Sequence, residues 1–417
     1  MSKGLGTTAG RSSRRHLLRL AGSGITMAVL GAGLTGCEDE SATGGEGSVP
    51  PPRTPSPENG KGGQDGGAGE DGKAPAPVWS RTTSAQTYGD NDELVAVDGV
   101  VIASGDPLAA LAGATGEQRW SLAEGATPGA PLLLGGGTLY LASGKYDGSV
   151  IGYVPESGEE SWRSRLGKEY RQPRPVAVDA EQVYVIAEIL EADGSSRTNV
   201  IAALNSATGK VVWKEQRDLG TEQNGVHAAV RGRHLVYTDF KKNLTVRDTA
   251  TGRQVWTHKT TKTSYGPFAV HGDLVIVPQG SRLQAFALAD GSEKWSVEAE
   301  EFSLFREPSL VDGVLYIADS GRMLWALDPA TGKKVWQSTA LRDAKVQVPR
   351  QFVRVGGTLY GATDLDPEGG VHAVDAKTGA LRWTFNDGSG DYHAWLVATD
   401  GKHVFALHGN KLHALPA

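Results

Sequence analysis

A glycine followed four residues later by a tryptophan recurs at regular intervals through most of this chain. In each copy, an alternating apolar stretch and a short polar turn lead up to the glycine, as in residues 327–332 before Trp336. From Trp120 onward, successive tryptophans are separated by 42, 51, 43, 39, 41 and 47 residues. A period of this length indicates a repeat architecture. The tryptophans in this register are Trp120, Trp162, Trp213, Trp256, Trp295, Trp336 and Trp383.

Each unit also contains two runs of β-forming residues joined by a tight turn. Residues 309–317, with Asp312 and Gly313 at the centre, are one example. Asp-Gly and Gly-Gly pairs favour hairpins because their turns need positive φ angles. Four short antiparallel strands per unit, with no helical periodicity, are typical of a propeller blade. We therefore predict an all-β propeller in which the tryptophan lies on the last strand of each blade.

The two ends of the repeat region complement each other. Residues 396–415 supply three strands of a last unit, whereas residues 77–80 supply an isolated tryptophan strand with Trp79. Their pairing would close the ring and remove its exposed edges. We predict eight blades over residues 77–417. A buried tryptophan removes roughly 150–250 Å² from water, so we assign all eight repeat tryptophans to packing between blades and none to a ligand.

The first 37 residues have the pattern of an export signal. Arg14 and Arg15 precede an apolar run, residues 21–33, that is too short to span a bilayer. The paired arginines resemble a twin-arginine signal. Residues 34–37 (Leu-Thr-Gly-Cys) resemble the lipobox of bacterial lipoproteins, which implies cleavage and lipidation at Cys37. We expect the protein to be attached to the cell membrane through this lipid, on its extracytoplasmic face.

Residues 38–76 are dominated by Gly, Pro, Ser and acidic residues, and Val49 is their only large aliphatic residue. Such a segment cannot bury enough apolar surface to offset its loss of conformational entropy. We predict a disordered tether between the lipid and the propeller.

Charge and cysteine content exclude several classes of protein. The formal net charge is −6, and removal of the leader, which has five basic and no acidic residues, would bring it to about −11. An acidic surface argues against nucleic-acid binding, because phosphate contacts need an excess of Lys and Arg. A single cysteine rules out an internal disulfide and any cysteine-based metal centre. The closed ring predicts a monomer.

The phrases quoted above resemble the quinoprotein-type propeller repeat, Ala-x-Asp-x-x-Thr-Gly-x-x-x-Trp, over residues 77–417. Members of that family include eight-bladed quinone-dependent alcohol dehydrogenases and the non-catalytic propeller lipoprotein of the outer-membrane assembly machinery. The enzymes hold pyrroloquinoline quinone (PQQ) and Ca²⁺ beside a disulfide of neighbouring cysteines, which this chain cannot form. Its repeat units are also close to the minimum length of a four-stranded blade. We therefore expect no cofactor, with PQQ and Ca²⁺ kept as the alternative. The ten histidines show no zinc-site spacing and we find no catalytic constellation, so we predict neither a metal site nor catalytic residues.

In an up-and-down blade, the first-to-second and third-to-fourth strand turns share one face of the ring. They are tight here, whereas residues 188–199, 338–348 and 363–370 form long connections on the other face. Surface loops tolerate variation in length and sequence, and they often carry the residues that bind a partner. We therefore place partner binding on this second face. Alternatively, Arg306 and Arg350 are paired locally with Glu307 or Asp391. The predicted binding residues near the channel mouth are Arg171, Tyr265, Arg306, Arg350, Tyr392 and His393.

The sequence therefore favours a membrane-anchored, non-catalytic scaffold that binds a protein or another ligand. The alternative is a PQQ- or metal-dependent oxidoreductase of reduced size. Recognition of a cell-wall polymer would require a row of exposed aromatic residues, for which Tyr88, Tyr265 and Tyr392 are sparse candidates. The arginine-rich leader and the high Gly and Ala content suggest a Gram-positive bacterium of high GC content.

Overall fold

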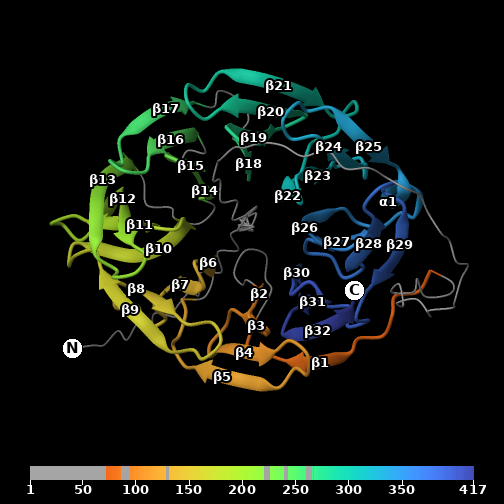
Figure 1. The fold of residues 1–417 in the computed structure, drawn as a ribbon, viewed down its shortest axis with the longest axis horizontal. Helices are drawn as coiled ribbons and strands as arrows, with labels where there is room; N and C mark the ends of the chain where they lie inside the picture. Colours follow the sequence, from red (N-terminus) through yellow and green to blue (C-terminus); the bar gives the residue numbers. More distant parts are fainter. Residues whose placement is uncertain are drawn as a thin grey trace, which may run out of the picture.

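The computed structural model describes residues 72–85, 94–127, 131–219, 226–238, 243–259, 265 and 267–417. Within these ranges, the strands form eight four-stranded antiparallel sheets, arranged as blades around a central axis (Figure 1). The prediction of an eight-bladed all-β propeller is confirmed. The predicted export signal, with Arg14, Arg15 and Cys37, and the tether up to residue 71 lie outside the described residues.

In blades 1 to 7 the chain runs from the innermost strand to the outermost one. Blade 1 contains β2 (Leu94–Val97), β3 (Val100–Ala103), β4 (Leu108–Ala112) and β5 (Gln118–Leu122). Blade 2 contains β6 (Leu133–Gly135), β7 (Thr138–Ala142), β8 (Ser149–Tyr153) and β9 (Glu160–Arg165). Blade 3 contains β10 (Tyr170–Val178), β11 (Gln182–Leu190), β12 (Ser196–Asn205) and β13 (Val211–Leu219). Blade 4 contains β14 (Ala228–Arg231), β15 (His234–Thr238), β16 (Leu244–Asp248) and β17 (Gln254–His258).

The second half of the ring continues in the same order. Blade 5 contains β18 (Ala269–His271), β19 (Leu274–Gln279), β20 (Arg282–Ala287) and β21 (Glu293–Glu298). Blade 6 contains β22 (Ser309–Val311), β23 (Val314–Ala318), β24 (Leu324–Leu327) and β25 (Lys334–Ser338). Blade 7 contains β26 (Pro349–Val355), β27 (Thr358–Thr363), β28 (Val371–Asp375) and β29 (Leu381–Phe385). Blade 8 combines β30 (Trp395–Thr399), β31 (His403–His408) and β32 (Lys411–Pro416) with β1 (Trp79–Thr82).

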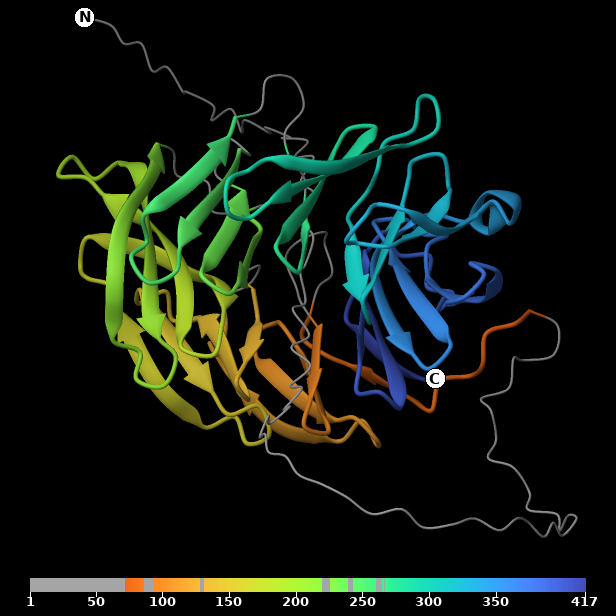
Figure 2. The ribbon, with the colours of Figure 1, turned by 45° about the horizontal axis from the view of Figure 1, so that its top comes forward.

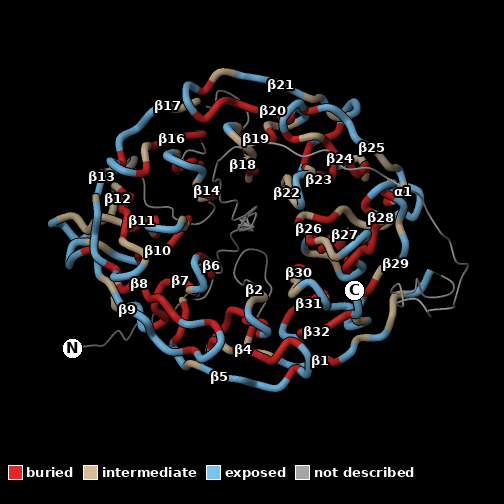
Figure 3. The backbone as a smooth tube through the Cα atoms, in the orientation of Figure 1, coloured by how far each residue is buried: buried red, intermediate tan, exposed pale blue. Residues whose placement is uncertain are grey.

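Burial follows the position of a strand within its blade. The middle strands are covered on both faces by the neighbouring blades, and all four residues of β3 are buried. The outermost strands keep one face in water, so β21 alternates between exposed and half-buried residues. Figure 3 shows the contrast, with buried backbone inside the ring and exposed backbone at its rim. The hydrophobic core is therefore distributed over the seams between blades.

In seven of the eight seams, the tryptophan of one blade packs against the glycine turn of the next blade. The glycine has positive φ, and its Cα lies against the indole of the preceding blade. For example, a Cβ added at Gly332 (φ 70°) would lie 2.6 Å from the Trp295 ring. The indole N–H also donates a hydrogen bond of 2.7–3.2 Å to a carbonyl 32–44 residues further on. This bond is made by Trp79, Trp120, Trp162, Trp213, Trp256, Trp295 and Trp336.

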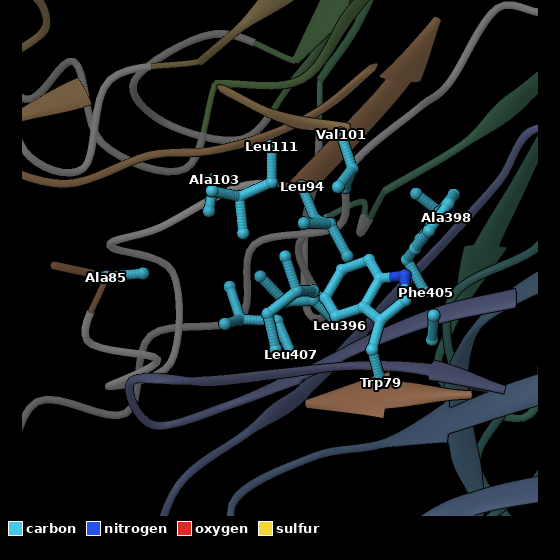
Figure 4. Close-up of a cluster of buried hydrophobic side chains, with 12 residues drawn as sticks. Trp79, Ala85, Leu94, Val101, Ala103, Leu111, Leu396, Ala398, Phe405 and Leu407 are labelled. Carbon is cyan, nitrogen blue, oxygen red and sulfur yellow. The ribbon is translucent and has the colours of Figure 1, made fainter. Parts of the chain in front are cut away.

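The ring closes where the beginning of the propeller pairs with its end. Strand β1 is antiparallel to β32, with Trp79 opposite Ala414 and Thr82 opposite Lys411. Trp79 is 7% exposed and packs with residues of blades 1 and 8, among them Leu94 and Phe405 (Figure 4). Because the third and fourth strands of blade 8 come from opposite ends of the chain, this blade has no glycine turn.

Two connections differ from their sequence-based descriptions. Residues 188–199 are not a long loop, because β11 and β12 continue to pair up to Leu190 and Ser196. Residues 338–348 contain a short helix, α1 (Ala340–Asp343), in a chain predicted to have none. Among the described residues, no helix is long and apolar enough to cross a membrane.

A buried histidine holds the connection that contains α1. The His372 side chain in β28 is fully buried, and its Nδ1 lies 2.8 Å from the Thr384 hydroxyl. Its Nε2 lies 2.9 Å from the Gln347 carbonyl oxygen, in the connection between blades 6 and 7. Burial lowers the pKa of His372 to about 4. The imidazole is therefore neutral at physiological pH and acts as a structural link.

The seam contact predicts different costs for two glycines of blade 6. Gly332→Ala places a methyl group against Trp295, whereas Gly313→Ala, at a similar φ of 76°, meets no atom within 4 Å. Both variants bear the penalty of about 1–2 kcal/mol for an alanine at positive φ. We expect Gly332→Ala to lose a further ~1–3 kcal/mol from overpacking, measured by urea denaturation. Equal losses for the two variants would contradict the seam as described.

The neutral state of His372 predicts a pH-dependent stability. The unfolded chain binds a proton near pH 6.5 and the folded chain only near pH 4, so stability decreases as pH falls between these values. The full effect is about 3 kcal/mol. We expect His372→Gln, which keeps hydrogen-bonding groups but does not titrate, to show a shallower decrease in denaturation midpoint from pH 7 to pH 4. Identical pH profiles for variant and wild type would contradict this assignment.

Candidate binding face

The second-to-third strand loops and the connections between blades share one face of the ring, which we call the loop face. The opposite face has only tight turns, such as Asp312-Gly313 between β22 and β23. Figure 2 presents the ring obliquely, with loops of unequal length projecting from it. The loop face comprises the described parts of residues 104–107, 143–148, 191–195, 239–243, 280–281, 319–323, 364–370 and 409–410, and of the connections 83–93, 123–132, 166–169, 220–227, 259–268, 299–308, 339–348 and 386–394.

Large side chains stand exposed on the loop face. Phe302 is 93% exposed, Tyr146 69%, Tyr392 62% and Leu304 54%. Every other large hydrophobic residue that is exposed in the described ranges is a valine of an outermost strand or of the opposite side. Phe302 and Leu304 share the connection between blades 5 and 6, whereas Tyr146 and Tyr392 lie in loops of other blades. The sequence analysis identified only Tyr392 of these four residues.

The connection that carries Phe302 and Leu304 is held firmly in place. Ser320 accepts a 2.9 Å hydrogen bond from the Leu304 N–H through its hydroxyl, and its own N–H donates to the Leu304 carbonyl at 2.9 Å. The N–H of Phe305 donates to the Gly280 carbonyl, and the Phe305 ring packs edge-on against Trp325 at 5.5 Å. Phe302 is thus held in water by an ordered loop.

Helix α1 braces the same connection from the neighbouring blade. Arg342 donates hydrogen bonds of 2.8 Å to the Gly321 carbonyl and to the Glu300 carboxylate. The loops of blades 5 and 6 and the connection after blade 6 therefore form one hydrogen-bonded unit around Phe302.

Strained backbone is concentrated on the same face. Among the described non-glycine residues with positive φ, Asp98 and Asp312 belong to tight hairpin turns. All the others lie in the loops defined above or at the adjoining start of β10: Glu124, Tyr146, Gln172, Phe302, Arg322 and Lys345. Strain of this kind persists only where the surrounding structure imposes it, and it is enriched at functional sites.

The three arginines that were predicted to bind a partner differ in their exposure. Arg171 in β10 and Arg306 before β22 are exposed. The Arg350 side chain is only 10% exposed, and its Nη1 lies 3.8 Å from Asp364 Oδ1. The alternative of a local ion pair therefore applies to Arg350, with a partner that the sequence analysis did not consider. The structure thus leaves Arg306 exposed and largely buries the side chain of Arg350.

The ring-bearing residues that were predicted to bind a partner also differ in their exposure. Tyr392 is exposed, and the neighbouring His393 is half-buried, with its ring 5.9 Å from that of His408. Tyr265 is only 6% exposed and packs edge-on against Phe286 in the seam between blades 4 and 5. The expectation that Tyr265 is available to a partner is therefore wrong, because its ring is part of the core.

A buried polar cluster anchors the connection that carries Tyr392. The Asp387 carboxylate lies 3.0 Å from His408 Nδ1 and 3.7 Å from His413 Nε2, and the three side chains are 2–7% exposed. His413 Nδ1 lies 2.8 Å from the hydroxyl of Ser80 on β1. The Trp395 ring stacks on His408 at 4.3 Å. The cluster thus joins the closing strand pair to the connection between blades 7 and 8.

The charge state of the cluster follows from burial and hydrogen bonding. Burial acts to raise the pKa of Asp387, but the hydrogen bonds from His408 and Ser389 outweigh it, so its pKa is below the ordinary value. Burial lowers the pKa of His413 against the attraction of Asp387. At neutral pH we therefore expect an ionised Asp387 beside a neutral His413. The sequence did not predict this contact, because His408 and His413 lie on strands far along the chain from Asp387.

Among the residues that the structure describes, no group of three or more His, Cys, Asp and Glu side chains could hold a metal ion. The Asp387 carboxylate is engaged by two histidines inside blade 8.

Comparison with known proteins agrees with this architecture. The sequence model of a family described as outer membrane protein assembly factor BamB matches residues 70–195, 106–224 and 196–364. A polyvinylalcohol dehydrogenase of Sphingopyxis sp. is 26% identical over 46% of this chain and 31% of its own length. BamB of Bordetella pertussis is 26% identical over 58% of this chain and 62% of its own length. The chain thus spans less than two thirds of either relative.

Solved structures share the fold. BamB from Moraxella catarrhalis superposes with a TM-score of 0.54 at 14% identity, covering 82% of this chain and 99% of that one. A quinohemoprotein alcohol dehydrogenase from Pseudomonas putida gives a TM-score of 0.53 at 13% identity, covering 81% and 76%. The expectation of a Gram-positive origin finds no support in these comparisons, since the matching family is named for an outer membrane. The chain belongs to the family of BamB-type propellers with PQQ-like repeats.

Proposed function

We propose that this protein is a membrane-anchored, extracytoplasmic scaffold that binds a protein partner through its loop face and performs no catalysis itself. One observation carries the proposal: in the described ranges, the exposed aromatic residues Phe302, Tyr146 and Tyr392 all project from ordered loops of that face. Aromatic side chains are enriched among the residues that dominate binding energy.

The ordered loops strengthen this interpretation. Binding normally costs about 0.5–1.5 kcal/mol for each flexible side chain that becomes immobilised, and further free energy when a loop becomes ordered. The connection around Phe302 is already fixed by Ser320 and Arg342 before any partner arrives. The surface is therefore preorganised for association.

The comparisons support the proposal at the level of family. The matching family is described as an assembly factor, and the Moraxella BamB structure is covered over nearly its whole length by this chain. The lipid at Cys37 and the tether over residues 38–76 would hold the propeller near a membrane while leaving its loop face free to turn toward a partner. These two features remain predictions from the sequence.

Removal of the exposed rings should abolish partner recovery without unfolding the propeller. We expect Phe302→Ala combined with Tyr392→Ala to reduce recovery of the partner at least tenfold in quantitative pull-downs with the tagged full chain from solubilised membranes of its own cells. The matched control is Val255→Ala combined with Val335→Ala, which truncates exposed residues of outermost strands. The control should stay within twofold of wild type. Equal recovery with both double variants would refute the loop face as the binding site.

The alternative, a PQQ- or metal-dependent oxidoreductase of reduced size, is favoured by the similarity to polyvinylalcohol dehydrogenase. A direct titration distinguishes the two functions. We expect the visible spectrum of PQQ with Ca²⁺ to stay unchanged on addition of the purified full chain, because the described residues offer no metal-binding group. A saturable spectral change, with reduction of the quinone by an added alcohol, would favour the enzyme.

A further inference from the structure

The seam between blades 7 and 8 lacks the glycine turn that packs on the indole in the other seven seams. Its tryptophan is Trp383 of blade 7, and it faces a blade whose third and fourth strands come from opposite ends of the chain. Trp383 is nevertheless only 7% exposed, the same fraction as Trp79, which does pack on a glycine turn. Another part of the chain must therefore contribute to covering this seam.

Residues 72–78, which lead into β1, run from blade 7 to blade 8. Lys73 forms a parallel bridge with Thr384 of β29. The N–H of Val78 donates a 2.7 Å hydrogen bond to the Ala414 carbonyl of β32. In Figure 1 this segment follows the rim of the ring from the side of β29 to β1. It is therefore held by backbone contacts to both blades.

The segment also contacts the apolar core of the seam. Ala74 is half-buried and packs against the buried cluster that contains Trp383, Phe385 and Trp395. Ala76, two residues further on, is exposed. One side of the segment thus faces the seam and the other faces water.

The sequence of this segment favours the extended shape in which it lies. Residues 74–77 read Ala-Pro-Ala-Pro. Each proline fixes its own φ and biases the residue before it toward an extended conformation. Such restriction reduces the conformational entropy that is lost when the segment docks. These last residues of the predicted tether are therefore suited to a fixed position on the propeller.

The same cluster forms the base of the connection that carries Tyr392. Phe385 is the last residue of β29 and Trp395 the first residue of β30, and their rings pack edge-on at 5.8 Å. Residues 386–394 therefore begin and end beside these two rings. A segment that covers the cluster supports both ends of this loop-face connection.

We infer that residues 73–77 form a strap that docks on the seam between blades 7 and 8 in place of the missing glycine turn, fastens the tether to the rim of blade 7 and stabilises the base of the Tyr392 connection. The membrane attachment predicted at Cys37 is then joined to the ring through blade 7 as well as through β1. The value of this brace for partner binding rests on the proposed function, whereas the docking of the strap does not.

Thiol labelling tests the docking. Ala74→Cys and Ala76→Cys are introduced singly into the full chain with Cys37→Ser, which removes the competing thiol. We expect iodoacetamide to modify the Ala74→Cys variant at least about fivefold more slowly than the Ala76→Cys variant, because reaction at residue 74 requires the strap to open. In urea the two rates should be equal. Equal rates in the folded protein would overturn the inference.

Aspartate variants test the brace. Ala74→Asp places a carboxylate against the apolar cluster, whereas Ala76→Asp adds the same charge in water. We expect Ala74→Asp to lower the thermal midpoint by at least about 2 °C. It should also speed amide hydrogen exchange in peptides from residues 386–394 by about threefold or more.

Ala76→Asp is the matched control and should leave both measurements at their wild-type values. The inference is overturned if the two aspartate variants behave alike, or if exchange in residues 386–394 does not respond to Ala74→Asp. Because no partner is used, these experiments can fail while the pull-down above succeeds, and they can succeed while it fails.

Discussion

The contact between an indole and a glycine turn determines the rest of the architecture. Seven of the eight seams combine a large flat ring on one blade with an absent side chain on the next, and Gly332 against Trp295 illustrates both features. Burial of one such ring removes roughly 150–250 Å² from water, about 4–6 kcal/mol as an upper bound. The hydrogen bond from the indole fixes the rotation of each blade relative to its neighbour. Seven such seams and the pairing of β1 with β32 in blade 8 close the ring.

This construction separates stability from recognition. The glycine turns lie on one face of the ring. A longer turn there would disturb the seam, so the turns on that face stay short. The loop face carries none of the glycine–tryptophan contacts and can vary, and the longer connections, the short helix α1 and the non-hairpin strained residues of the described ranges are found on that side. The exposed aromatic residues Phe302, Tyr146 and Tyr392 are therefore distributed around one rim of the ring.

The sequence predicted the seams well because tryptophan and glycine that recur at a fixed spacing are compatible with few folds. It predicted the loop face poorly because exposure there depends on tertiary contacts. Tyr265 and Phe302 are both aromatic residues in connections between blades, yet Tyr265 packs on Phe286 while Phe302 stands in water. Asp387 contacts histidines 21 and 26 residues away on two different strands, and no local pattern predicts such a contact.

The distribution of polar and apolar groups bears on the choice between binding and catalysis. An active site exposes reactive charged groups in a cleft lined by apolar walls. Here the buried reactive groups serve as internal supports: Asp387 joins two histidines, His372 holds the connection of α1, and Asp319 accepts the indole N–H of Trp325 at 2.9 Å. Their hydrogen-bonding capacity is directed to fixing loops, while large apolar side chains face the water. This arrangement supports the proposed binding role of the loop face.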